Sequence, residues 1–322
     1  MIYNSDCITG SKKYYSDNQF DLIVCDPPFG IGETSFDKHY NRKEKTVITG
    51  YKEAPDDYAK FSFEWLQEAK RVLKENGSIY VISGWTNLHH ILTAMSKLDF
   101  NVVNHIVWKY NFGVNTKKKF VSSHYHIIYA TKSKNSKPIF NTNCRFGSQE
   151  KSEGGSSLLY RDLEDVWTIN KEFQPGGVKN KNKLPEELLK KIIMYSSNEN
   201  DKVCDFFLGN FTTANVAKKL GRNPYGFEMN KKSFDINVKN LEKIEFGSEL
   251  KNLKKVENII PKNSGKSFTD KEINSILKDF KSLISAGKTK KNTIDIIGQK
   301  YGRGYWSIIK LLDKIKLESK NK

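Results

Sequence analysis

Apolar residues recur along the chain in two alternating periods, and the order of these periods predicts an α/β fold. Residues 20–25 form a short, mostly apolar run, which is typical of a strand buried on both faces of a sheet. From residue 58 to residue 73 the apolar positions recur every three to four residues, as on one face of a helix. Further strands are predicted at 2–3, 78–83, 101–110, 124–132, 201–209 (a strand and a turn) and 224–230, and further helices at 87–100, 184–197 and 211–221.

The β–α–β order of residues 1–245 predicts a parallel sheet with helices packed against it. Two stretches interrupt this rhythm. Residues 30–55 are polar, basic and dotted with aromatic side chains, and residues 131–183 are rich in Lys, Asn, Gly and Ser. Because a long irregular segment inside a compact domain is more often functional than connective, we expect the first stretch to serve a site. Trp85 and Trp108 are expected in the core.

A different organisation begins after residue 245. Residues 246–266 have the composition of a linker, and residues 267–322 have the periodicity of a small helical domain. Thr269 and Glu272 form a capping-box pattern at its start. A Gly-containing turn at Arg303 separates two apolar helices, and this pattern resembles a helix-turn-helix that enters a DNA groove. A helical tail for dimer formation or docking is the alternative.

The charge balance favours a polyanionic partner. The 322 residues carry a net charge of +17, while 28% are charged and 37% hydrophobic, as in folded globular proteins. Residues 261–322 alone hold 15 Lys and Arg against 6 Asp and Glu, a net of +9. Such a surplus suits phosphate contacts, because binding them releases counterions. The alternative is a lysine-rich solvated surface with no such partner.

Several other classes of protein are disfavoured. The N-terminus lacks a signal-peptide core, and no apolar stretch approaches the ~18 residues that a membrane span needs. We therefore expect a cytoplasmic protein without a membrane partner. The cysteines are spaced too widely for a paired metal knuckle, so we expect four reduced, mostly buried thiols and no metal: Cys7, Cys25, Cys144 and Cys204.

Two of the predicted strands end in an acid followed by turn residues. "IVCDPPFG" places Asp26 at one strand end, and "KVCDFFLGNFTT" places Asp205 at another, before a Gly turn and a helix. Glu228 closes the next strand, 23 residues after Asp205. In nucleotide-binding α/β sheets this layout puts backbone N–H groups beside the ligand and a carboxylate on its ribose hydroxyls.

The two motifs in this order resemble those of the DNA amino-methyltransferases that use S-adenosylmethionine. In the permuted, β-type group the DPPY/F motif comes first, a recognition region follows, and a "DPFxGSGTT" cofactor motif comes last. The likeness covers residues 1–245, with "DC" at 6–7 and "SSHYHIIYATK" at 122–132. It implies a Rossmann-like methyltransferase sheet in circularly permuted order, with an inserted recognition region at about 111–183.

The resemblance implies a role for each residue of the first motif. An amine conjugated to its base is a poor nucleophile, so the site must accept its hydrogens. The Asp26 carboxylate and the Pro27 carbonyl would be the acceptors, and proline offers no competing N–H. Pro28 continues the turn, and Phe29 would stack on a base flipped out of the duplex.

The resemblance also assigns the cofactor residues. Glu228, with Met229 adjacent, would bind the ribose, and Asp6 with its neighbour Cys7 would contact the adenine edge. Asp205 would support the turn, and Lys183 and Asn182 would lie near the cofactor carboxylate. The residues at the methionine end would be Phe207, Gly209, Asn210 and Thr212. Phe211 departs from the family, which has glycine there. That departure leaves open an inactive, methyltransferase-like DNA-binding subunit.

The expected partner is double-stranded DNA. The residues expected to contact it are Lys117, Lys118, Lys119, Arg145, Arg161, Lys179, Lys181 and Arg303. The resemblance further implies a homodimer and a cognate restriction endonuclease. Aspartate as the first motif residue favours the N6 amine of adenine. The N4 amine of cytosine is the nearest alternative, and an RNA adenine is a more distant one.

Overall fold

The computed structural model describes residues 1–29, 56–111, 113, 117–172, 183–250, 262–263 and 265–318. The segment 30–55, Lys179, Lys181 and Asn182 lie outside these described residues. The chain divides into two compact units, Met1–Val256 and Glu257–Lys322, which we describe separately.

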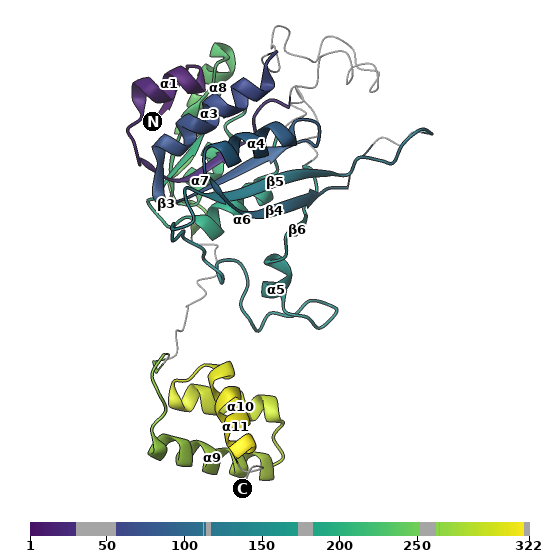
Figure 1. Cartoon of the computed structure of the whole chain (residues 1–322), viewed down its shortest axis with the longest axis vertical. Helices are drawn as coiled ribbons and strands as arrows, with labels where there is room; N and C mark the ends of the chain where they lie inside the picture. Colours follow the sequence, from purple (N-terminus) through teal and green to yellow (C-terminus); the bar gives the residue numbers. More distant parts are fainter. Residues whose placement is uncertain are drawn as a thin grey trace. The chain divides into compact units, whose positions relative to one another are not determined.

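The first unit is built on one sheet of eight strands in the order β1-β8-β7-β2-β3-β5-β4-β6 (Figure 1). Because β2 lies between β7 and β3, the two acidic strand ends predicted from the sequence belong to neighbouring strands. The strands are β1 (Ile2–Tyr3), β2 (Phe20–Cys25), β3 (Leu73–Ser83), β4 (Asn101–Lys109), β5 (His124–Thr131), β6 (Val166–Thr168), β7 (Lys202–Asp205) and β8 (Asn223–Phe227).

The sheet is mixed rather than wholly parallel, which corrects the prediction. Strands β1, β8, β7, β2 and β3 run parallel, but β5 runs antiparallel to both of its neighbours, β3 and β4. The described residues between β4 and β5 include no crossover helix, and two strands joined by a short connection pair antiparallel. As a result β5 starts at the edge where β3 and β4 end.

Helices cover both faces of the sheet. Alternate residues of β2 point to opposite sides, with Ile23 packed against one layer and Leu22 against the other. The first layer contains α1 (Cys7–Tyr14), α3 (Tyr58–Val72) and α4 (Leu88–Lys97), and the second contains α6 (Glu186–Ser196) and α7 (Thr212–Lys219). Among the helices of the described residues, none has the length and apolar character to cross a lipid bilayer.

The apolar pattern did not predict α1, α5 (Leu158–Asp162), α8 (Lys231–Glu242) or β6. These elements are short or mostly polar, and contacts outside their own sequence stabilise them; Asp6, for example, caps α1. Trp108 is buried as predicted, at 2% exposure. Trp85 is not: it lies beyond the end of β3 and is 74% exposed.

The second unit is a small helical domain whose core is aliphatic. Its helices are α9 (Asp270–Ser285), α10 (Lys290–Tyr301) and α11 (Tyr305–Glu318), packed around Ile276, Ile294, Ile297 and Ile308. The predicted N-cap is present, since the Thr269 hydroxyl accepts from the N–H of Glu272 at 3.3 Å. Gly302 adopts a left-handed conformation, with φ of 60°, in the turn between α10 and α11.

The predicted linker, 246–266, is partly absorbed by the two units. The N–H groups of Gly247 and Glu249 donate to carbonyls of α7 at 2.9 Å, so the first unit continues past residue 245. At the other end the N–H of Asn263 donates to the Gly302 carbonyl at 2.9 Å, which places that residue in the helical domain.

Candidate active site

Acidic side chains follow four neighbouring strands at one edge of the sheet. Asp26 follows β2, Asp205 ends β7, Glu228 follows β8, and Asp6 lies three residues beyond β1. Because these four strands are parallel and adjacent, their carboxyl ends meet at the same edge, where α/β sheets bind ligands. The structure therefore brings together the carboxylates that the motifs predicted.

Asp26 is a buried hydrogen-bond acceptor without a donor. Its Oδ1 is shielded from solvent and has no hydrogen-bond partner among the described residues. Burial, and to a lesser extent the neighbouring Asp205, raises the pKa of the carboxyl to about 8, while Lys171 opposes the rise. An unpaired buried acceptor is costly to fold, so its presence here points to a role in binding.

The turn after Asp26 is held by the loop that follows β3. The Asn87 side-chain amide donates to the Phe29 carbonyl at 2.6 Å. Gly84 lies against the Phe29 ring, where a Cβ would stand 3.5 Å from the nearest ring atom. On another side the Phe29 ring lies 5.3 Å from the ring of Tyr125, at the start of β5. The turn thus presents its aromatic ring at the same edge as the Asp26 carboxylate.

Lys171 is a member of this site that sequence reasoning missed. It follows β6, in a segment without periodicity, and no motif marks it. Its Nζ lies 4.3 Å from the Tyr110 ring centroid and 4.7 Å from that of Tyr125. Burial lowers the pKa of Lys171, and the Asp26 carboxylate opposes that change. Only the order of β4, β5 and β6 in the sheet explains why these side chains meet.

The carboxylates on the other half of the edge organise the backbone around them. Asp205 accepts from the Phe207 N–H at 2.8 Å; burial raises its pKa to about 6, and bonds from Thr213 and that N–H oppose the rise. Glu228 accepts from the Asn230 N–H at 2.6 Å. Burial raises the pKa of Glu228, and the hydrogen bonds from the Asn230 and Gly209 backbones oppose this rise. Asp205 therefore supports the turn, as expected.

Other predicted cofactor residues are placed as follows. Cys7 and Thr212 are buried, and Met229 is 67% exposed. The Phe207 ring packs edge-on against Trp65, at 5.3 Å between centroids. Asp6 caps α1 by accepting from two N–H groups at 2.9 Å. Lys183 lies 3.4 Å from Glu172 and 3.8 Å from Glu186, while Asn210 follows Gly209 in the turn.

Phe211 is explained by the core behind this turn. Its backbone is left-handed, with φ of 59°, a conformation that glycine adopts freely and other residues adopt at about 1–2 kcal/mol. The ring is fully buried beside Leu208 and Ala214, with its centroid 6.1 Å from that of Phe234 in α8. Burying a phenyl ring contributes about 1.5–3 kcal/mol, which offsets the strained backbone.

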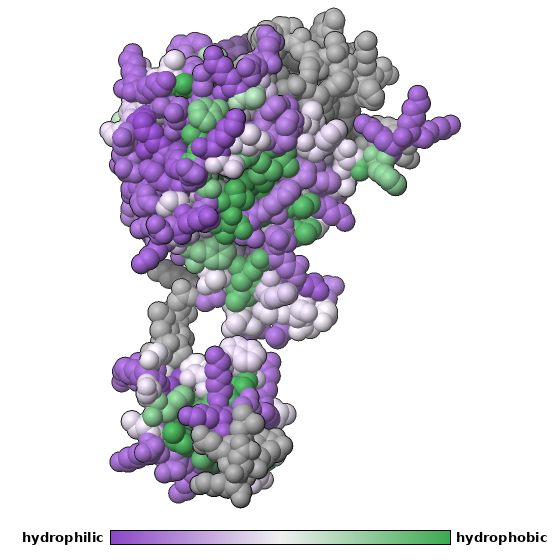
Figure 2. Space-filling model, in the orientation of Figure 1, coloured by the Kyte–Doolittle hydropathy of each residue, from purple (hydrophilic) through white to green (hydrophobic). Residues whose placement is uncertain are grey.

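The basic residues predicted to contact DNA fall into two groups. Lys117, Lys118 and Lys119 are exposed in the connection between β4 and β5, beside Phe120, which is 99% exposed. This connection projects from the sheet (Figures 1 and 2). Arg161 is also exposed, on α5.

Arg145 and Arg303 are instead held inside their units, contrary to the surface position expected for them. Arg145 pairs with Asp162 at 2.8 Å and with Glu187 at 2.5 Å. Arg303 is 5% exposed and donates to both carboxylate oxygens of Glu272 and to three backbone carbonyls. Its guanidinium is therefore hydrogen-bonded within the helical domain. We leave both out of the DNA surface.

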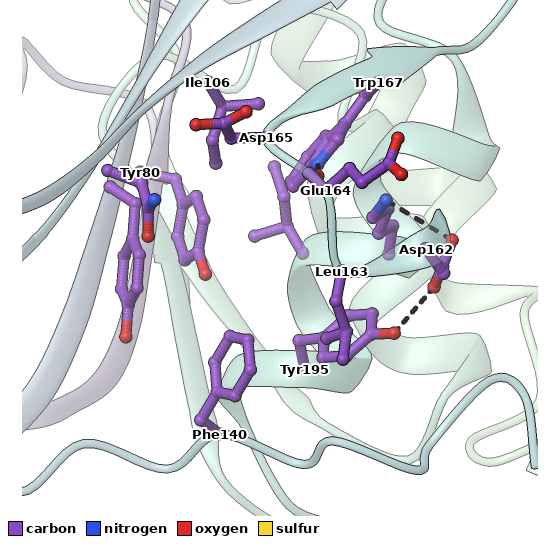
Figure 3. A pocket seen from close by; sticks show the side chains of 13 residues that line it. Tyr80, Ile106, Phe140, Asp162, Leu163, Glu164, Asp165, Trp167 and Tyr195 are labelled. Atoms are coloured by element: carbon purple, nitrogen blue, oxygen red, sulfur yellow. Dashed lines mark hydrogen bonds and ion pairs between the residues drawn. The ribbon is translucent and has the colours of Figure 1, made fainter. Parts of the chain in front are cut away.

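A small cavity beside the recognition region is a packing feature and not a ligand site. Figure 3 shows Phe140, Tyr80, Trp167 and Tyr195 around it. Its volume of about 50 Å³ has room for waters but not for a nucleotide. Asp162, on its wall, accepts from the Tyr195 hydroxyl at 2.7 Å, and an ammonium from α6 lies 3.3 Å away. These contacts fasten α5 to the sheet domain.

The buried acid at Asp26 has a measurable cost. Its pKa is higher in the folded protein than in the unfolded chain, so its stabilising contribution is present below pH 4 and is lost as the pH rises through about 8. Asp26→Asn should therefore raise the free energy of unfolding at pH 8 by on the order of 3 kcal/mol, and the gain should vanish toward pH 4. Denaturant unfolding followed by fluorescence measures this difference.

Asp235→Asn on the exposed surface of α8 is the matched control and should change stability by under about 0.5 kcal/mol at every pH. An equal effect of both substitutions, or a gain at Asp26 that does not depend on pH, would contradict the assignment.

Comparison with known proteins identifies the family. The family model N6_N4_Mtase, described as DNA methylase, matches residues 20–239. Type II methyltransferase M.HinfI of Haemophilus influenzae is 33% identical over 260 residues, which span 76% of this chain and 68% of that relative. Type II methyltransferase M2.LlaDCHI of Lactococcus lactis subsp. cremoris is 30% identical over 234 residues, or 69% and 82%.

Solved structures agree with the fold. The M1.HpyAVI–SAM complex has a TM-score of 0.54 at 23% identity and covers 75% of this chain and 98% of its own. The PvuII DNA methyltransferase, described as cytosine-N4-specific, has a TM-score of 0.52 at 14% identity and covers 75% and 92%. The sheet is therefore the methyltransferase sheet that the motif order predicted. From the matches along most of its length, this chain belongs to the N6/N4 DNA methylase family of DNA methyltransferases.

Proposed function

We propose that this protein transfers a methyl group from S-adenosylmethionine to the N6 amine of an adenine flipped out of double-stranded DNA. The observation that carries the proposal is the buried Asp26 Oδ1, which has no donor among the described residues and stands three positions before the Phe29 ring. An incoming amine can supply the missing hydrogen bond.

The residues of the turn have complementary tasks. Asp26 and the Pro27 carbonyl would accept the two amine hydrogens, which leaves the nitrogen lone pair directed out of the base plane toward an electrophile. Phe29 would stack on the base and hold its plane. Placing the amine in this way is the main contribution that the protein can make, since methyl transfer is an in-line displacement.

The other half of the edge fits a nucleoside with a charged sulfonium side chain. When bound, S-adenosylmethionine would supply the methyl group. Glu228 would accept from the ribose hydroxyls, Asp6 lies at the adenine side, and the turn at Gly209 would face the methionine end. A Cβ at Gly209 would meet nothing closer than 3.9 Å, so this part of the turn is open to a ligand.

Adenine is favoured over cytosine by the residue type at position 26. Both bases present an amine, and the fold is shared with a cytosine-N4-specific enzyme, so the architecture does not decide between them. In the family that the motif resembles, aspartate accompanies adenine and serine accompanies cytosine. Asp26 therefore supports N6 methylation.

The competing function is that of an inactive, DNA-binding subunit. The reason for considering it was Phe211, which stands where the family has glycine. Because that ring is fully buried beneath α8, it fills the core behind the turn rather than projecting into solvent. The burial of Phe211 therefore supports a competent cofactor site.

Binding and transfer should be measured on the same preparation. Calorimetry is expected to show S-adenosylmethionine binding, and labelled-methyl transfer to DNA followed by nucleoside analysis should yield N6-methyladenine at one sequence. Asp26→Ala should lower the transfer rate by at least about 100-fold, because an amine hydrogen loses its acceptor, while cofactor binding changes little. Asp235→Ala, on the exposed surface of α8, is the control.

Folded protein that binds no cofactor would support the inactive subunit, and N4-methylcytosine as product would overturn the adenine assignment. Methylation confined to one sequence would also support a restriction–modification role, because a cognate nuclease would be blocked at that sequence. The homodimer stays a prediction that sedimentation can check.

The projecting tip, Lys117–Phe120, is proposed as a DNA contact. Three lysines beside an exposed ring suit a phosphate backbone. Replacing Lys117, Lys118 and Lys119 with Ala should weaken DNA binding and reduce the salt dependence of log K by up to about three. The single-turnover rate at saturating DNA should stay within about twofold.

The matched control replaces three exposed lysines of α8, Lys231, Lys232 and Lys239, with Ala. If this control weakens binding as much, or if the salt dependence is unchanged in the tip variant, the tip is not a DNA contact.

The helical tail is proposed as a second DNA contact, outside the matched family region. On α11, Trp306 is 71% exposed and Lys310, one helical turn later, is exposed on the same face. Replacing both with Ala should weaken DNA binding by about three- to tenfold and leave the sedimentation coefficient unchanged. Lys271→Ala with Ile284→Ala on α9 is the control. Loss of a dimer instead of loss of DNA affinity would favour the docking tail.

A further inference from the structure

A second polar group lies at the same edge of the sheet as Asp26, and the function proposed above assigns it no task. Lys171 reaches the edge of the sheet from the segment after β6. The rings of Tyr110 and Tyr125 lie 5.2 Å apart and both lie against its ammonium, at 4.3 and 4.7 Å. A cation held over two ring faces has a defined position, because the electron-rich faces attract it.

Lys171 and Asp26 lie at the same edge of the sheet, but neither satisfies the hydrogen bonding of the other. Their charges interact, since each shifts the pKa of the other toward its ionised form. Within the described part of the chain, however, no ion pair or hydrogen bond joins them, and Asp26 Oδ1 has no donor. This edge of the sheet therefore offers one acceptor without a donor and one ammonium that does not pair with it.

Aromatic side chains beside Asp26 and Lys171 define the plane in which a bound base would lie. Phe29 lies 5.3 Å from Tyr125, which in turn lies against Lys171. A flat base stacked on Phe29 would turn its polar edge toward both Asp26 and Lys171. The groups on that edge then decide which base fits.

The amine-bearing bases carry complementary groups in adjacent positions. In adenine the N6 amine donates and the neighbouring N1 accepts, and in cytosine N4 and N3 do the same. Guanine and thymine reverse the pattern at the matching positions, with a carbonyl beside a ring N–H. A carboxylate beside an ammonium therefore suits adenine and cytosine and rejects the other two.

We propose that Lys171 is a specificity-determining residue that donates a hydrogen bond to the ring nitrogen next to the target amine. The inference rests on the proposed function and deepens it, since it assigns a second contact to the same base. Asp26 binds the amine, and Lys171 reads the neighbouring nitrogen. The alternative is a purely structural lysine that only packs between the two tyrosines.

The test pairs one protein atom with one base atom. Single-turnover methyl transfer is measured for wild type and Lys171→Met on DNA with adenine, or with 1-deazaadenine, at the target. Wild type should lose about tenfold on 1-deazaadenine, because the ammonium loses its acceptor. Lys171→Met should lose about tenfold on adenine and show no further loss on 1-deazaadenine.

The quantity compared is the ratio of the rates on adenine and on 1-deazaadenine, taken for each protein. This ratio removes effects of the analogue that both proteins share. 1-Deazaadenine pairs weakly with thymine, which changes flipping equally in both proteins. Lys171→Gln, which keeps a donor, should recover part of the adenine rate and part of the sensitivity to the analogue. Lys97→Met, at the exposed end of α4, is the matched control and should behave as wild type.

Two results would overturn the inference: wild-type activity of Lys171→Met on adenine, or the same loss on 1-deazaadenine in both proteins. If Lys171→Met does not fold, the Gln variant decides, because a structural lysine predicts no link between its rate and the base atom. If wild type transfers no methyl group to any base, the proposed function fails instead. If cytosine is the target, 3-deazacytosine is the probe.

Discussion

The site depends on one carboxylate oxygen, Asp26 Oδ1, that folding shields from water without giving it a hydrogen-bond donor among the described residues. Asp26 ends a strand in the middle of the sheet, where burial and the neighbouring Asp205 both disfavour its charge. Such a group destabilises the native state, and it is kept only where the surrounding structure fixes it. Here the fixed turn, the buried strand and the Asn87 contact to Phe29 do so. The same burial leaves the acceptor ready for an amine.

The sheet order makes the site a meeting point of distant segments. The strand ends that hold Asp205 and Glu228 come from the last third of the catalytic unit; β7 pairs with β2, and β8 pairs with β7. On the other side, the antiparallel β5 starts where β3 and β4 end, which brings Tyr125 and Lys171 to the edge. One half of the edge thus fits a nucleoside cofactor and the other half an aromatic base.

The motifs predicted the parts of the site that local sequence encodes. Asp26, Asp205 and Glu228 each close an apolar run, so their common edge followed from the α/β pattern. The direction of β5 did not follow, because the apolar pattern of a strand does not encode the direction in which it pairs with β3 and β4. Lys171 could not be predicted, because it stands in an irregular segment without a motif. Arg303 was predicted to be a surface cation, but it pairs with Glu272, a contact between residues far apart in the sequence that no local pattern reveals. Phe211 became intelligible only with α8 in place.

The most direct test of this account is the titration of the Asp26 carboxyl itself. Carbon-13 NMR of wild type, assigned by comparison with Asp26→Asn, would follow that carbon from pH 4 to pH 10. We predict a midpoint near pH 8 in the DNA-free protein, because burial and Asp205 outweigh Lys171. A midpoint near 4, the value of a solvated aspartate, would contradict a buried acceptor awaiting its donor.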